Sequence, residues 1–281
     1  MTQPRNTDPY SDPRAFYGSE LRRLREAAGL TQDQLGRRVF CSAAYIGQFE
    51  TAIRRPQLEL SQLLDDVLGS GEHLQRLCHL ARNSKVAEYF ADAAEFEQQA
   101  RMISEYAPVL IPGVLQSEAY ARSLIREAQR FAPQQVVDTY VANRMARAQL
   151  LDGPTAPVFW AILHETALRV PIGGPEAISE QLAHLATTAR SRHNVVLQVL
   201  PFAAGAHPFL NTMVSLMHFS DAPPVIYTEG AYSGQLIDDP PLVAKFQSAY
   251  DLARAAALSP QASLSLIESA AKDWATHEHR I

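Results

Sequence analysis

The sequence of 281 residues has few cysteines, few lysines and no long apolar run. Its two cysteines, Cys41 and Cys78, lack the spacing of a metal site or a redox pair, so we expect reduced thiols in a cytoplasmic protein. No apolar run approaches the roughly 18 residues that a membrane span needs, so no membrane partner is expected. Residues 1–13 are polar and proline-rich and lack the apolar core of a secretory signal; we expect a flexible N-terminal arm.

The charge is unevenly distributed along the chain. Apolar residues make up 47% of the sequence and charged residues 20%, which is typical of a globular protein. The net charge of −5 argues against a protein that coats nucleic acid with its whole surface. Residues 14–56 contain eight arginines and four acidic residues, a balance of +4, and the remainder carries −9. Either this basic segment is a local DNA-binding face or it arose by chance.

Four short helices are predicted in the first 72 residues. Thr31 and Ser42 are typical N-caps, and Gly29 is a typical helix end. The four predicted helices span residues 14–28, 32–39, 43–51 and 58–68. Because short helices with short connections are unstable alone, they are expected to pack on one another as one domain over residues 14–72.

The second and third predicted helices have the pattern of a helix-turn-helix. Two helices that cross steeply need a small residue where they touch, and Gly36 is that residue. The apolar residues at the offsets needed for a shared core are Leu35, Val39, Cys41, Ile46 and Phe49. The spacing therefore predicts a DNA-binding helix-turn-helix.

The motif LRRLREAAGLTQDQLGRRV, followed by S-x-x-Y-I-x-x-F-E and R-R-P, resembles the Xre family of phage-repressor-like and Cro-like regulators over residues 18–68. The resemblance implies a lambda-repressor-like all-α domain. The family usually has glycine at the turn position that Phe40 occupies here. A non-glycine residue at positive φ costs about 1 kcal/mol. Either the turn is built differently or the ring of Phe40 packs.

The resemblance also implies roles for individual residues. The third helix would enter the major groove of an operator with its N-terminus first. The residues that would face DNA there are Ser42, Ala43, Ala44, Tyr45 and Gln48. Only Gln48 has an amide that pairs bidentately with adenine, whereas the alanines would contact a thymine methyl. For Tyr45 and Gln48 the alternative is an ordinary solvated helix face.

Further roles follow from the same resemblance. Gln32, Arg54 and Arg55 would hold backbone phosphates, and Arg25 and Glu50 would form a buried ion pair between the first and third helices. One module with so few base contacts has modest affinity. We therefore expect a homodimer on two half-sites, formed through the fourth helix or the C-terminal part.

The C-terminal part is predicted to be an α+β domain over residues 106–281. Residues 74–106 keep a helical pattern, so residues 73–105 are predicted to be a helical connector or the start of the second domain. Apolar runs predict strands at 158–163, 195–200, 213–219 and 225–229. Helices are predicted at 117–130 and 136–151, between the first two strands at 174–190, and from Pro240 and Pro260 onward, giving a small sheet with surrounding helices.

Four segments in this part resemble one actinobacterial domain. They are IPGVLQSEAYARSLI, FWAILHETALRVPIGGPE, VVLQVLPFAAGAHP and VIYTEGAYSGQLIDDP. Together they resemble the C-terminal domain of WhiJ-like Xre regulators over nearly all of residues 106–270. The role of that domain is not established, but the genes often lie beside one for a small partner protein. With only three lysines among 25 basic residues, the chain also fits a high-GC genome.

No catalytic motif is recognisable in the C-terminal part. The candidates are His164, Glu165, His207, Glu229, Asp238 and Asp239, none with metal-ligand spacing. Neither a nucleophile elbow nor a phosphate loop is present. The turn Gly173–Gly174–Pro175 is either an anion cradle or a plain connection. We expect no enzyme, no cofactor and no metal.

A ligand pocket is one interpretation of the loop 201–208, because α/β proteins often bind ligands after strand ends. The residues that would line it are Phe202, His207, Tyr227, Glu229 and Tyr232. A purely structural loop is the alternative.

Three functions fit these patterns. The first is a sequence-specific transcription regulator whose C-terminal domain responds to a small molecule or a small partner protein. The second is an antitoxin-like neutraliser of a small partner, encoded by a neighbouring gene, with autoregulatory DNA binding. The third is an enzyme with an appended DNA-binding domain. The first two predict a cytoplasmic protein that joins the nucleoid when DNA-bound.

Overall fold

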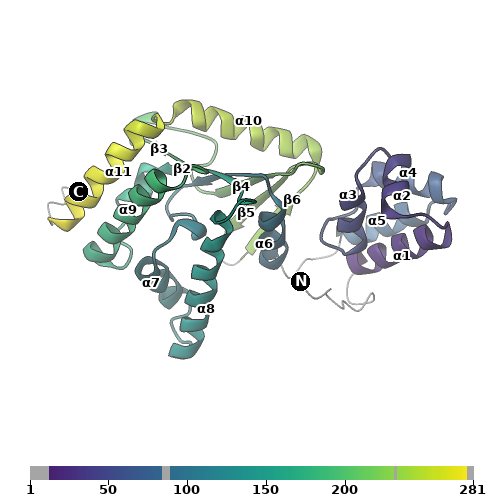
Figure 1. The fold of residues 1–281 in the computed structure, drawn as a ribbon, viewed down its shortest axis with the longest axis horizontal. Helices are drawn as coiled ribbons and strands as arrows, with labels where there is room; N and C mark the ends of the chain where they lie inside the picture. Colours follow the sequence, from purple (N-terminus) through teal and green to yellow (C-terminus); the bar gives the residue numbers. More distant parts are fainter. Residues whose placement is uncertain (1–12, 84–88, 231–232, 277–281) are drawn as a thin grey trace. The chain divides into compact units, whose positions relative to one another are not determined.

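The computed structural model describes residues 13–83, 89–230 and 233–276, which fall into two compact units (Figure 1). The first unit comprises residues 1–92 together with Phe219–Pro224, and the second comprises residues 93–218 and 225–281. Each unit has an apolar core of its own. Among the described residues, no helix has both the length and the apolar character needed to cross a bilayer.

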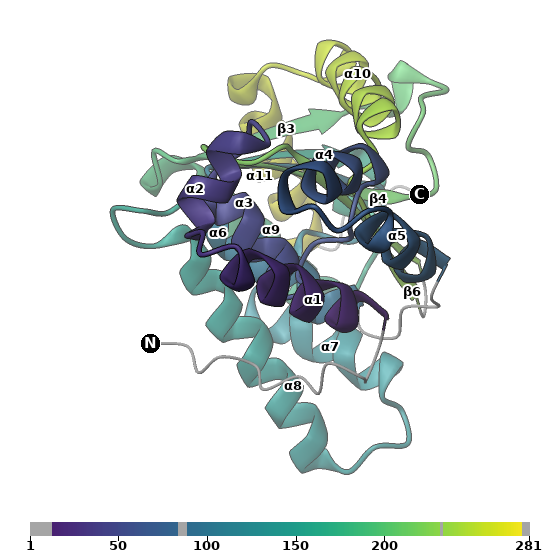
Figure 2. The ribbon, with the colours of Figure 1, turned by 90° about the vertical axis from the view of Figure 1, so that its right-hand side faces the viewer.

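The described part of the first unit, up to residue 83, forms five helices. They are α1 (Pro13–Ala27), α2 (Gln32–Arg38), α3 (Ala43–Glu50), α4 (Leu58–Leu68) and α5 (His73–Asn83). In Figure 2, α1 runs beneath α2 and α3, and α4 and α5 lie beside them. Tyr17, Leu35, Ile46, Phe49 and Leu64 meet in the buried core. The prediction of an all-α N-terminal domain is confirmed.

Capping side chains set the helix ends in this unit. Thr31 and Gln34 form a reciprocal capping box at the start of α2, with hydrogen bonds of 3.2 and 2.9 Å. The hydroxyl of Ser42 accepts from the backbone N–H of Tyr45 at the start of α3. These caps are local, which explains why the sequence alone places the two helices correctly.

Asp65 joins α4 to α5. Its carboxylate accepts hydrogen bonds from the backbone N–H groups of Leu74 and Gln75, at 2.9 and 3.0 Å, and from the Ser70 hydroxyl. Burial acts to raise the pKa of Asp65, but these hydrogen bonds outweigh it and the pKa is lowered. The carboxylate therefore stays charged and accepts from N–H groups in the first turn of α5, which have no partner within the helix.

The second unit contains a six-stranded mixed sheet. The strands are β1 (Met102–Ala107), β2 (Val158–His164), β3 (Val195–Leu200), β4 (Met213–His218), β5 (Val225–Gly230) and β6 (Ser233–Ile237). Their order is β3-β2-β1-β4-β5-β6. The pairs β1–β2 and β2–β3 are parallel, and the other pairs are antiparallel. The predicted α+β class is confirmed.

The prediction of helix through residue 106 is wrong at its end. Residues 73–105 contain α5 and α6 (Tyr89–Gln99), but Met102–Ala107 form β1. This strand lies between β2 and β4, and Ile103 to Ala107 are all buried. A strand covered on both faces has no polar–apolar alternation, so its pattern merges with the helical stripe before it. The second unit accordingly begins at residue 93, before the predicted boundary.

Helices cover both faces of the sheet. In Figure 1, α10 (Pro240–Ala256) lies above the sheet, and α7 (Glu118–Ala128) and α8 (Gln134–Arg147) lie below it. Val243, Tyr250 and Ala253 pack α10 onto the face that carries Tyr106 and Val214.

The remaining two helices pack on one another at the β3 end of the sheet. These are α9 (Gly174–Ser191) and α11 (Pro260–Ala275). The Ser263 hydroxyl accepts from the backbone N–H of Val199 at 2.8 Å. This bond satisfies a donor on the free edge of β3, where no strand could supply an acceptor.

Candidate nucleic-acid interface

Glycines allow the helices of the motif to approach closely. A Cβ on Gly36 would lie 2.6 Å from the carbonyl oxygen of Cys41, so a side chain there would force α2 away from the turn. Gly18 on α1 is equally constrained, because its Cβ would lie 2.5 Å from the carbonyl oxygen of Phe49. The helical pattern of α1 gave no indication of this second contact, which joins α1 to α3.

Phe40 lies in the turn with φ of 58° and 90% of its surface exposed. Neither explanation offered above holds. The turn keeps the positive φ for which the family uses glycine, and the ring does not pack. The residue thus carries backbone strain of about 1–2 kcal/mol and presents an exposed aromatic ring beside α3.

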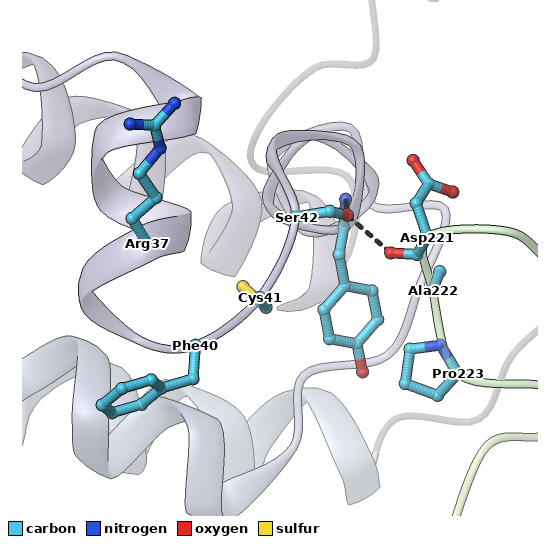
Figure 3. A pocket seen from close by; sticks show the side chains of 8 residues that line it. Arg37, Phe40, Cys41, Ser42, Asp221, Ala222 and Pro223 are labelled. Atoms are coloured by element: carbon cyan, nitrogen blue, oxygen red, sulfur yellow. Dashed lines mark hydrogen bonds between the residues drawn. The ribbon is translucent and has the colours of Figure 1, made fainter.

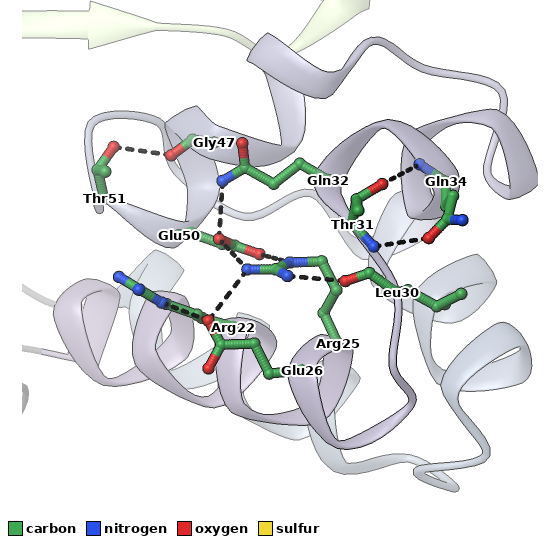
Figure 4. Close-up of polar contacts among 10 residues, drawn as sticks. All are labelled: Arg22, Arg25, Glu26, Leu30, Thr31, Gln32, Gln34, Gly47, Glu50 and Thr51. Atoms are coloured by element: carbon green, nitrogen blue, oxygen red, sulfur yellow. Dashed lines mark hydrogen bonds and ion pairs between the residues drawn. The ribbon is translucent and has the colours of Figure 1, made fainter.

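A buried ion pair links α1 to α3. Nε of Arg25 lies 2.5 Å from Oε1 of Glu50, and Nη2 lies 3.0 Å from Oε2 (Figure 4). Nη1 of Arg25 also donates to the carbonyl oxygen of Leu30 at 2.8 Å. The hydrogen bond to Glu50 raises the pKa of Arg25. The pair fixes the orientation of α3 on α1.

Gln32 takes part in the same network. Its amide nitrogen donates to Oε2 of Glu50 at 2.9 Å (Figure 4). The resemblance assigned Gln32 to a DNA phosphate, and in this structure its side chain is directed at Glu50 instead. The same amide lies against Gly47. A Cβ added at Gly47 would be 3.5 Å from it.

The predicted DNA-facing residues divide into two groups. Ala44 is exposed, and Ser42, Ala43 and Arg55 are half-buried. Tyr45, Gln48 and Arg54 are buried, and only 1% of the surface of Arg54 is exposed.

The buried group forms a stack around Arg54. Nε of Arg54 donates to the amide oxygen of Gln48 at 3.0 Å. Its guanidinium carbon lies 4.8 Å from the ring centroid of Tyr45, a distance typical of a cation–π contact.

A distant part of the chain covers this stack. We call Phe219–Pro224, which belongs to the first unit, the covering segment. The Ser42 hydroxyl donates to the carbonyl oxygen of Asp221 at 2.6 Å (Figure 3), and Nη2 of Arg54 donates to that of Pro223 at 3.1 Å. Ala222 packs against the core of the first unit. The sequence indicated only a turn here, because no local pattern shows what a turn will contact.

A hollow of about 420 Å³ lies at the N-terminus of α3, between the turn and the covering segment (Figure 3). It is lined by Arg37, Phe40, Cys41, Ser42, Tyr45, Asp221, Ala222 and Pro223. Burial raises the pKa of Cys41 to about 11, so its thiol is neutral at pH 7.

The structure does not bring the predicted ligand-pocket residues together. His207 hydrogen-bonds the Tyr106 hydroxyl at 3.0 Å, on the α10 face of the sheet. Tyr227 pairs in register with Ser215, and alternation along the strands places both on the opposite face. Glu229 shares that face with Tyr227. The proposed single pocket is therefore wrong, and Tyr232 lies outside the described residues.

Phe202 lies with His207 and not with Tyr227 and Glu229. Its ring contacts that of His164, with centroids 5.4 Å apart. The rings of His164 and His207 also lie 5.5 Å apart.

Tyr227 and Glu229 instead share their face with a cluster of charges, which we call the sheet-face cluster. It comprises Glu97, Glu105, Arg144, Arg147, Ser215, Tyr227 and Glu229. Arg147 pairs with Glu97 through hydrogen bonds of 3.0 and 2.5 Å. Arg144 donates to the amide oxygen of Gln116 at 3.0 Å. Sequence reasoning missed this cluster, although a glutamate within a buried strand is unusual.

Two polar residues of the cluster, Glu105 and Ser215, are buried. Glu105 lies in the central strand β1 and is 8% exposed. Burial raises its pKa to about 8, and the negative charge of Glu97 adds to the effect. The Ser215 hydroxyl is also buried without a hydrogen-bond partner among the described residues. Buried polar groups ordinarily have partners, so the cluster is a candidate site for a polar ligand.

Two helices joined by a tight turn, set on α1 by a buried ion pair, define a helix-turn-helix DNA-binding protein. Residues 17–77 match the family described as helix-turn-helix domain. Residues 90–269, more than half of the chain, match the family described as domain of unknown function (DUF5753), and the chain belongs to that family. Searches of curated proteins and of solved structures find no match. The predicted helix-turn-helix regulator is confirmed at this level.

Proposed function

We propose that the protein is a sequence-specific transcription regulator of the Xre type, as in actinobacterial WhiJ-like proteins, that binds its operator through α3. The observation that supports this most is the α2–turn–α3 geometry, with Gly36 at the crossing and Arg25 paired to Glu50. The same segment is the basic part of an otherwise acidic chain. In this role the protein acts in the cytoplasm at the nucleoid, and the proposal assigns no catalytic step to either unit.

In the proposed complex, the N-terminus of α3 enters the major groove. Ser42, Ala43 and Ala44 approach base edges there, and Gln48 pairs with an adenine. Arg54 and Arg55 hold backbone phosphates, which positions the helix without selecting sequence. Gln48 and Arg54 must first leave the stack that buries them.

The proposed complex is a homodimer on two half-sites about one helical turn apart. The support is energetic, since one short helix with a single strong base discriminator gives modest affinity, and doubling the contacts raises it.

The proposed role of the second unit is to respond to a small polar molecule. The sheet-face cluster supports this, because Glu105 is buried there and the Ser215 hydroxyl is buried without a hydrogen-bond partner among the described residues. The guanidinium of Arg144 belongs to the same cluster. It donates to the amide oxygen of Gln116, which carries no negative charge. A ligand with both a carboxylate and hydrogen-bond donors fits these groups.

Selection of binding sites from a random duplex library tests the proposed function. The full chain is expected to enrich one sequence motif, and analytical ultracentrifugation is expected to show a dimer on the enriched duplex. Gln135→Ala on the exposed side of α8 is the matched control for Gln48→Ala. Failure to enrich any motif would contradict the proposal.

A further inference from the structure

We infer that the covering segment, Phe219–Pro224, is an autoinhibitory element that occupies the DNA-reading face of α3 and must leave before an operator binds. The inference rests on the proposed function, because it concerns access to the same helix. It assigns a regulatory contact to residues in which the sequence indicated only a turn.

The first contact lies at the N-terminus of α3. The Ser42 hydroxyl donates to the carbonyl oxygen of Asp221 at 2.6 Å while it accepts from the N–H of Tyr45 at 3.1 Å. A hydroxyl has one hydrogen to donate. While Asp221 accepts it, Ser42 has no hydrogen for a phosphate oxygen or a base.

The second contact buries Arg54. Its guanidinium donates to the carbonyl oxygen of Pro223 and lies 5.8 Å from the ring centroid of Phe219. Among the residues whose burial the structure describes, Arg54 is the largest fully buried side chain. A guanidinium held in this way cannot reach a DNA phosphate, and its bond to Gln48 also engages the amide of the proposed base reader.

The covering segment resembles the DNA backbone in its hydrogen-bond acceptors. It presents carbonyl oxygens as acceptors to a hydroxyl and a guanidinium, as phosphate oxygens do. Asp221 adds an exposed negative charge beside a basic motif. Pro223 and Pro224 have no N–H, so these two residues bring acceptors without donors. The segment and DNA therefore compete for the same side chains.

The chain connects this segment directly to the sheet-face cluster. Phe219–Pro224 joins β4 to β5. Ser215 lies in β4, and Tyr227 and Glu229 lie in β5 on the same face of the sheet. A ligand that changes this hairpin also acts on the segment at its tip. The covered and uncovered forms are then the two states that such a switch requires.

Two substitutions test whether the covering segment blocks α3. Ala222→Glu places a larger, charged side chain against the core of the first unit, and Phe219→Ser removes the ring beside Arg54. Ala222→Glu adds negative charge, which by itself weakens DNA binding. Ala203→Glu, at an exposed position of the short 3-10 helix Phe202–Ala204, is the matched control. Circular dichroism checks that each variant is folded.

The affinity for the selected operator, measured by fluorescence anisotropy, is expected to rise in both variants and not in Ala203→Glu. If nine-tenths of the molecules are covered, release raises the apparent affinity about tenfold. The preferred sequence is expected to stay the same. Folded variants with unchanged or lower affinity would overturn the inference, because the segment would then be a permanent part of the fold or of the DNA contact.

Thiol reactivity gives a second measurement without DNA. Cys41 lines the hollow beside the covering segment, whereas Cys78 is buried in the core. In Ala222→Glu and Phe219→Ser, Ellman's reagent is expected to react several-fold faster with Cys41 and no faster with Cys78. Acceleration at both cysteines would indicate unfolding and count against the inference. Absence of DNA binding by the wild type and by both variants would instead contradict the proposed function.

Discussion

Arg54 donates a 3.0 Å hydrogen bond to Gln48, so the proposed phosphate contact and the proposed base reader hold one another in the buried stack. The covering segment closes this stack through Pro223. In the proposed account, DNA recognition depends on two steps, the release of the stack and the docking of α3. The predictions below address each step and the scaffold that supports it.

Gln48→Ala is expected to change base preference. Loss of one bidentate amide–adenine pair lowers affinity by roughly 1–3 kcal/mol and relaxes selection at one base position. Repeating the site selection with the variant and with Gln135→Ala measures this. An enriched motif identical to that of the wild type would mean that Gln48 does not read the operator.

Arg55→Ala is expected to weaken binding to all sequences alike. A lost phosphate contact reduces the dependence of log affinity on log salt concentration by about one. Anisotropy titrations between low and physiological salt give this slope. Arg130→Ala, an exposed arginine of the second unit, is the control. An unchanged slope would place Arg55 outside the DNA contact.

Glu50→Ala is expected to destabilise the first unit. The Glu50 side chain is 3% exposed, and its removal leaves the buried Arg25 without its counter-charge. Breaking such a pair costs about 3–5 kcal/mol, which denaturant unfolding of the full chain detects. Glu26→Ala, which removes a more exposed carboxylate near the same arginine, is expected to have little effect. Equal losses in the two variants would refute the structural role of the pair.

Phe40→Gly is expected to stabilise the fold by about 1 kcal/mol, because glycine adopts positive φ without the clash of a Cβ. Phe131 is also an exposed aromatic residue, but its φ is not positive. Phe131→Gly is therefore a control in which no gain is expected. A lower melting temperature for Phe40→Gly would show that the ring makes a stabilising contact.

Glu105 is expected to make stability depend on pH. Its pKa of about 8 in the folded protein exceeds its ordinary value of 4.5, so the folded state holds an extra proton between these limits. The contribution to stability is complete below the ordinary pKa and is lost as pH rises toward 8, at up to about 1.4 kcal/mol per pH unit. Unfolding at pH 5 to 8.5 is expected to show this slope in the wild type and a flatter one in Glu105→Gln. Parallel slopes would contradict it.

The sequence predicts the helices whose ends are set by residues close along the chain. Thr31 and Ser42 cap their helices within three residues, so α2 and α3 follow from local chemistry. β1 was missed because burial on both faces removes its alternation. The contact between Ser42 and Asp221 joins positions 179 residues apart, and no local pattern encodes such a contact. The helix-turn-helix could therefore be predicted from the sequence, and its contact with the covering segment could not.

The central claim is that α3 recognises a specific DNA sequence. The most direct test compares the affinity of the full chain, at physiological salt, for the selected operator and for a scrambled duplex of the same composition. Specific recognition predicts an affinity at least about 100-fold higher for the operator, since specific complexes are typically 10³–10⁷-fold tighter than non-specific ones. Equal affinity for the two duplexes would contradict the account.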